Sequence, residues 1–127
     1  MSSQTELNLS PDPISLSAPV PGHCGAVVEF YGVVRAREGE GEIEAIEYEC
    51  FEAMARGEFE KLFAEARRQW TLDRIELRHR IGVVRVGEAS LWIRIRSAHR
   101  AEAFAACQWI IDGMKRKVPI WKRPVGV

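Results

Sequence analysis

The sequence of 127 residues predicts a single α+β domain in which two principal helices cover a mainly antiparallel sheet. Two observations predict this class. Apolar and polar residues alternate with a period of two in several short segments, and two longer segments carry apolar residues at helical spacing. The segments follow one another in the order ββα–ββα, which suits helices packed on one face of the sheet.

An irregular arm is predicted for residues 1–24, and the folded domain for residues 25–127. The arm contains four prolines and five serines, a composition that is typical of loops.

The first two strands are predicted on either side of a charged, glycine-containing turn. The run AVVEFYGVVR (26–35) is rich in β-branched and aromatic residues and suits a largely buried strand. The turn RAREGEGEIE (35–44) is followed by a second alternating run, whose apolar members are Ile46, Tyr48 and Cys50. Because the two strands are neighbours in the sequence, we expect them to form a hairpin.

The second half of the chain supplies the helices and two more strands. A helix is predicted over 53–70, and alternation predicts strands over 75–81 and 91–96, separated by a turn region at 82–87. A last helix is predicted over 100–117, because Pro119 disfavours helical geometry in the residue before it. Its buried face is expected to consist of Phe104, Cys107, Ile110, Ile111 and Met114.

Composition excludes several classes of function. Eighteen Lys and Arg balance eighteen Asp and Glu, so no overall field draws the chain to nucleic acid or to an anionic membrane. Apolar stretches fall far short of the roughly 20 residues that span a bilayer, and no signal peptide opens the chain, which favours a cytoplasmic protein. Three widely spaced cysteines predict reduced thiols, with neither a disulfide framework nor a zinc site. The phosphate-binding glycine motifs of dinucleotide and P-loop enzymes are absent from the sequence.

Positive charge is concentrated near the end of the chain. The segment 115–123 holds three of the four lysines, two arginines and no acid, which makes it a candidate anion site. Lys115 and Lys122 are the candidates for chemistry, because the pKa of a lysine can be tuned for proton transfer. The alternative is an ordinary basic helix end, which the helix dipole favours by ~0.3–1 kcal/mol.

Two further places could bind an anion. His99 and Arg100 stand where a strand gives way to a helix, so free backbone N–H groups, a titratable ring and a planar guanidinium would lie together. Arg35 ends the first strand beside the turn. The alternative for all three is a solvated loop residue. His79 is predicted to be a hydrogen-bonded core residue and His23 to be too isolated for a metal site, so no metal is expected.

Five blocks together resemble the catalytic, large subunit of molybdopterin synthase. They are GAVVEFYGVVR (25–35), YECFEAMA (48–55), HRIG (79–82), SAHR (97–100) and KRKVPIWKR (115–123). The resemblance implies an α/β hammerhead-like fold for residues 25–127.

The resemblance also implies an activity and partners. Large subunits of this family are sulfurtransferases of molybdenum cofactor biosynthesis, which convert cyclic pyranopterin monophosphate into molybdopterin by building its dithiolene. The sulfur comes from the C-terminal Gly-Gly thiocarboxylate of a small ubiquitin-like subunit, and no further cofactor is implied. The large subunits form a homodimer at the centre of a heterotetramer, with no nucleic acid or membrane involved.

Residue roles follow from the same resemblance. Lys115 and Lys122 match the family's two lysines, which implies acid–base and charge-stabilising roles near the thiocarboxylate. The implied substrate-binding residues are Arg35, Phe30 and, contributed across the dimer, His99 and Arg100.

Two other functions remain open from the sequence. The first is a non-catalytic pterin- or anion-binding module of the same fold. The second is a small nucleic-acid-binding domain that uses the basic segment 115–123, which zero net charge and the lack of an exposed aromatic series oppose.

Overall fold

The computed structural model describes residues 4–7, 9–39 and 41–126 and confirms the α+β class. Its elements in chain order are β1 (Ala26–Val33), β2 (Arg37–Glu38), β3 (Gly41–Cys50), α1 (Glu52–Gln69), β4 (Arg74–His79), β5 (Gly82–Arg85), β6 (Ala89–Ser97), α2 (Arg100–Lys117) and β7 (Ile120–Gly126). No helix in this described part of the chain is long and apolar enough to cross a membrane.

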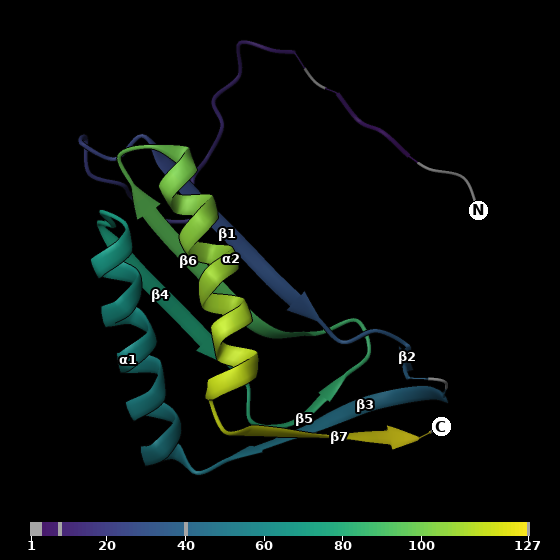
Figure 1. The fold of residues 1–127 in the computed structure, drawn as a ribbon. Coiled ribbons are helices and arrows are strands. Elements are labelled where there is room, and N and C mark those ends of the chain that lie inside the picture. Colours follow the sequence, from purple (N-terminus) through teal and green to yellow (C-terminus); the bar gives the residue numbers. More distant parts are fainter. Residues whose placement is uncertain (1–3, 8, 40, 127) are drawn as a thin grey trace.

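The first sheet has the strand order β1-β6-β4, and both of its pairings are antiparallel. Helices α1 and α2 lie side by side over one face of this sheet (Figure 1). The central strand β6 points Ile93 and Ile95 into the core with no exposed surface, where they pack with Ala103 and Ala106 of α2. Strand alternation places these isoleucines on one face, and the small alanines allow the helix to approach closely.

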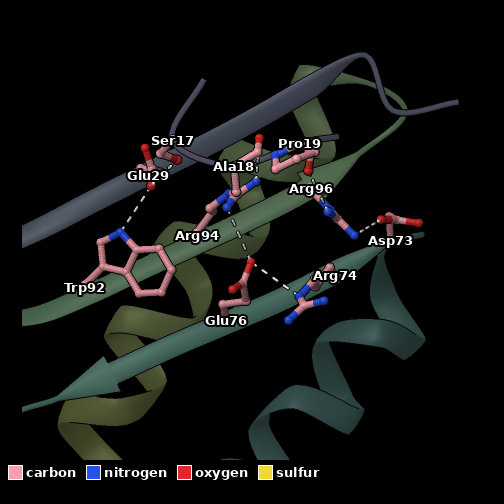
Figure 2. A network of polar contacts seen from close by, with 10 residues as sticks. All are labelled: Ser17, Ala18, Pro19, Glu29, Asp73, Arg74, Glu76, Trp92, Arg94 and Arg96. Atoms are coloured by element: carbon pink, nitrogen blue, oxygen red, sulfur yellow. Dashed lines mark hydrogen bonds and ion pairs between the residues drawn. The ribbon is translucent and has the colours of Figure 1, made fainter. Parts of the chain in front are cut away.

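The other face of this sheet is polar and carries part of the N-terminal arm. Arg94 and Arg96 of β6 donate hydrogen bonds to the carbonyl oxygens of Ala18 and Pro19, at 3.5 and 3.4 Å (Figure 2). Arg94 is almost fully buried and lies 3.8 Å from a carboxylate oxygen of Glu76 on β4. The described residues of the arm, 4–7 and 9–24, contain no helix or strand, and these contacts hold its last part on the sheet.

The second sheet is organised around β3. Strand β5 pairs with one edge of β3 and β7 with the other, while β2 pairs with its first residues. Figure 1 shows this sheet at the end of the molecule where α2 stops. Strand β7 follows α2 after a short turn, so the end of α2 and the second sheet lie next to each other.

Two strand predictions were wrong. The expected hairpin does not form, because β1 pairs with β6 through eight residue pairs and β3 belongs to the other sheet. The turn that contains Gly39 pairs β3 only with the two residues of β2. The region 82–87 was predicted as a turn, yet residues 82–85 form β5, because Val84 is fully buried opposite Ile46.

The predicted buried face of the last helix also needs one correction. Phe104 is 61% exposed, whereas Ala103 and Ala106 are fully buried and Cys107, Ile110 and Met114 are buried as expected. The sheet selects the alanines because only small side chains fit where the helix backbone comes closest to β6. The helical pattern assigns the large Phe104 to the buried face of the last helix, where the structure has the small Ala103 and Ala106.

Gly25 lies where the arm meets the folded domain, and its N–H donates to the carbonyl oxygens of Ser97 and Ala98 at 3.1 Å each. A Cβ added there would lie 2.5 Å from the Ala98 oxygen. We expect Gly25→Ala to lower the free energy of unfolding by about 1–3 kcal/mol in urea titrations, because backbone must move. Gly22→Ala is the matched control, since nothing lies within 4 Å of its added Cβ. Equal stability of the two variants would contradict this account.

Candidate functional site

A cavity of about 550 Å³ lies where the two sheets and the end of α2 meet. Four of the six site residues predicted from the sequence line it. They are Phe30, Arg35, Lys115 and Lys122. They come from β1, the residues that follow it, α2 and β7, so the fold brings together segments that are far apart in the chain.

Lys115 reaches the cavity from the last turn of α2. Ile111, Met114 and Val118 line the cavity with it, as expected for residues on one face of a helix. Its neighbours Arg116 and Lys117 do not line the cavity. The basic helix end is therefore divided, with only Lys115 directed to the cavity, and the helix dipole favours a cation in this last turn.

Lys122 reaches the cavity from β7, where it pairs with Tyr48 of β3 in the strand register. Its Nζ lies 2.8 Å from Oε1 of Glu38. The next residue, Arg123, instead forms an ion pair with Glu47 and does not line the cavity. Because neighbouring strand residues face opposite sides, pairing β7 with β3 selects Lys122 and excludes Arg123.

The charge in the cavity is positive overall. Arg35, Lys115 and Lys122 line it, and a hydrogen bond from Lys122 holds the pKa of the Glu38 carboxyl below its ordinary value. Phe30 and Tyr48 add aromatic surface to the same walls. Cations beside aromatic rings suit a ligand with a planar ring system and an anionic group.

His79, at the end of β4, lines the cavity and was missed as a site residue. Its Nδ1 lies 2.8 Å from the carbonyl oxygen of Arg80, and its ring meets that of Tyr48 edge to face at 5.0 Å. A carbonyl only accepts, so Nδ1 carries the proton and, in the neutral ring, Nε2 is an acceptor. The hydrogen bond predicted for His79 from the sequence is therefore present, with Arg80 as its partner. The alternation of β4 was the one signal in the sequence that placed this ring on the inner face.

A second cavity, of about 580 Å³, lies beside α1. Its lining includes Phe59 and Phe63 of the helix and Leu77 of β4. His79 and Ile120 line both cavities and so form the wall between them.

His99 and Arg100 do not line the cavity. They stand at the start of α2, and Arg100 is about 22 Å from Lys115 along the helix axis, at 1.5 Å per residue. The side chains of His99 and Arg100 therefore cannot reach the cavity of their own chain. They follow Ser97, which pairs with Ala26 at the beginning of β1, whereas Arg35 follows the other end of that strand.

One group among the described residues could hold a metal ion, and it lies away from the cavity lining. His23, Cys24 and Asp73 place their ligand atoms within 4.8 Å of one another. His23 is thus not isolated, because the fold brings Asp73 to it from a distant part of the sequence, at 2.8 Å. The other carboxylate oxygen of Asp73 is 2.8 Å from the guanidinium of Arg96, so a cation already neutralises this acid.

Comparison with known proteins gives the family. A sequence model described as MoaE protein matches residues 5–117. The chain belongs to the MoaE family. The matched residues include Lys115 and end before Lys122, which lies on β7.

Named relatives of this MoaE chain agree with the match. The human molybdopterin synthase catalytic subunit is 39% identical over 102 residues, which are 80% of this chain and 54% of the relative. The subunit of the same name from Thermoplasma volcanium is 41% identical over 101 residues, 80% of this chain and 74% of the relative. The chain spans about half to two thirds of the length of its mammalian relatives.

A solved structure shows the same fold. The crystal structure of molybdopterin synthase from Staphylococcus aureus superimposes with a TM-score of 0.80 at 30% identity, covering 85% of this chain and 79% of the other. The MoaE fold therefore extends over most of the described elements.

The half-buried ring of His79 makes the stability of this MoaE chain depend on pH. Burial lowers the pKa of His79 below 6.5, so the unfolded chain binds a proton first as the pH falls. The contribution of the neutral, buried His79 ring to the free energy of unfolding is therefore complete above about pH 6.5. It is lost as the pH falls through the pKa of His79 in the folded chain. We expect His79→Gln to flatten the decline of the free energy of unfolding between about pH 7 and pH 5, measured by urea titration.

The matched control for this measurement is His99→Gln. His99 is an exposed histidine outside the cavity lining, so this variant should keep the decline of the wild type. Parallel curves for the wild type and His79→Gln would show that burial of His79 does not set the dependence.

Proposed function

We propose that this chain is the catalytic subunit of a molybdopterin synthase, with residues 25–127 as its catalytic domain and 1–24 as an arm. Its reaction is the transfer of sulfur to cyclic pyranopterin monophosphate, which builds the dithiolene of molybdopterin. The donor is the C-terminal Gly-Gly thiocarboxylate of a small ubiquitin-like subunit. The observation that carries the proposal is the meeting of Phe30, Arg35, Lys115 and Lys122 in one cavity.

The cavity has the size and the groups that such a substrate needs. About 550 Å³ lies within the range of small-molecule sites. The forked guanidinium of Arg35 suits the substrate phosphate, and Phe30 offers a flat apolar surface to the pterin ring. Lys115 and Lys122 stabilise negative charge and move protons where the thiocarboxylate sulfur attacks. A cytoplasmic location fits three cysteines that form no disulfide.

The dimer is part of the proposal, because one edge of β1 has no partner strand among the residues that the structure describes. Phe30, Tyr31 and Val33 on this strand are all partly exposed apolar residues. Antiparallel pairing of β1 with the β1 of a second copy would bring the beginning of one strand to the end of the other. His99 and Arg100 of one copy would then approach Arg35 of its partner and complete the site.

Lys115→Ala tests the central assignment. In an assay of dithiolene formation with the thiocarboxylated small subunit and cyclic pyranopterin monophosphate, we expect turnover to fall by at least about 100-fold, as for loss of an acid–base group. Lys117→Ala is the matched control, because Lys117 lies in the same helix end but does not line the cavity. A folded wild type that binds the pterin without turnover would instead support the non-catalytic pterin- or anion-binding module.

Mixing two inactive variants tests the shared site. If Arg100 acts in the partner's cavity, a heterodimer of Arg100→Ala and Lys115→Ala contains one intact site. An equal mixture of the variants should recover about a quarter of the wild-type turnover after subunit exchange, since half of the dimers are mixed. No recovery, although light scattering shows dimers, would mean that both residues act within one chain.

A further inference from the structure

Glu38 is the only carboxylate among the described residues that line the cavity. Its Oε1 lies 2.8 Å from Nζ of Lys122, and 26% of its side chain is exposed, against 55% for the lysine. The acid thus lies on the protected side of this contact. It neutralises part of the positive charge that attracts a ligand.

Two of the three cations in the cavity act on this carboxylate. The hydrogen bond from Lys122 and the charge of Lys122 lower the pKa of Glu38, and the charge of Arg35 acts in the same direction, while burial opposes them. The group is therefore ionised at neutral pH. An incoming anion meets a negative charge in the field of Lys122 and Arg35.

The backbone holds Glu38 in this place. Strand β2 pairs with β3 through Arg37 with Glu42 and through Glu38 with Gly41, and Gly39 turns the chain between them with a φ of 62°. Neighbouring strand residues face opposite sides. Arg37 accordingly lies 3.8 Å from Glu42, outside the cavity lining, while Glu38 points to Lys122.

We propose that Glu38 is a built-in counterion of the anion site, which is paired with Lys122 in a cavity that Arg35 also lines and is displaced when an anionic group of the substrate binds. Binding then exchanges one anion for another, and affinity falls by the strength of the internal ion pair. Until that exchange, Glu38 positions the ammonium group of Lys122 at the cavity wall. This inference deepens the proposed function and rests on its premise that the cavity receives an anion.

The test measures the binding of inorganic phosphate to the full chain by titration calorimetry. We expect Glu38→Gln to bind phosphate about fivefold more tightly than the wild type, because a competing ion pair of ordinary strength is removed. Glu42→Gln is the matched control. It removes the same charge from the paired strands β2 and β3 but from outside the cavity, so its effect should stay within about twofold, since solvent screens it.

A second pair of variants ties the effect to Lys122. Glu38→Gln should change phosphate affinity by less than about twofold when Lys122 is already alanine, because the ion pair with Lys122 is then already absent. Glu38→Asp keeps the charge on a shorter side chain and should bind phosphate more weakly than Glu38→Gln. Phosphate binding by Glu38→Gln that is absent, or no tighter than that of the wild type, would overturn the proposal. So would a gain of equal size in the Lys122→Ala background.

The dithiolene assay separates this inference from the proposed function. We expect Glu38→Gln to lower KM for the pterin phosphate by a factor similar to its gain in phosphate affinity. An effect on kcat alone, with unchanged phosphate affinity, would also overturn the counterion. Tighter phosphate binding by the variant, in a protein without synthase turnover, would support the counterion and refute the synthase. Synthase turnover by a Glu38→Gln variant whose phosphate affinity and KM equal those of the wild type would support the synthase and refute the counterion.

Discussion

The packing of α2 on the central strand β6 is the contact on which the arrangement of the site depends. Ile93, Ile95 and Ile110 have no exposed surface in this layer, and Ala103 keeps the helix close to the strand. This packing turns an 18-residue helix into a rigid spacer of about 27 Å. Lys115 is held at one end of the spacer and His99 at the other. One molecule therefore brings together four of the six predicted residues, and the proposed use of both helix ends would require a second chain.

The second constraint is the double pairing of β3. Strand β5 pairs with one edge of β3 and β7 with the other, so β3 holds β7 next to the end of α2. The register Tyr48↔Lys122 then decides which basic residue of β7 reaches the cavity. Two acids are divided in the same way. Glu38 forms an ion pair with Lys122 inside the cavity, and Glu47 forms one with Arg123 outside it. A chain with no net charge thereby acquires a local cationic site whose strength is limited by one carboxylate.

Much of the secondary structure could be predicted because it depends on local periodicity. The helix predicted over 100–117 has the observed bounds, and the one predicted over 53–70 differs by a single residue at each end. The hairpin prediction failed because a period of two tells which residues share a face, and not which strand is the partner. Strand β5 was missed because Gly82, its first residue, and Gly87, just beyond its end, are typical of a turn. Its burial comes from Ile46, which lies far away in the sequence.

The sequence by itself determined the class of the fold, the family resemblance and the residue types of the site, since motifs and alternation are properties of the chain. It singled out six candidate residues, and four of them are Phe30, Arg35, Lys115 and Lys122. Only the tertiary structure decided that these four meet, that His99 and Arg100 stand apart, and that Glu38 and His79 join the cavity. The physical reason is that convergence depends on strand partners and helix direction. Both are set by the burial of side chains against distant segments, which no local pattern encodes.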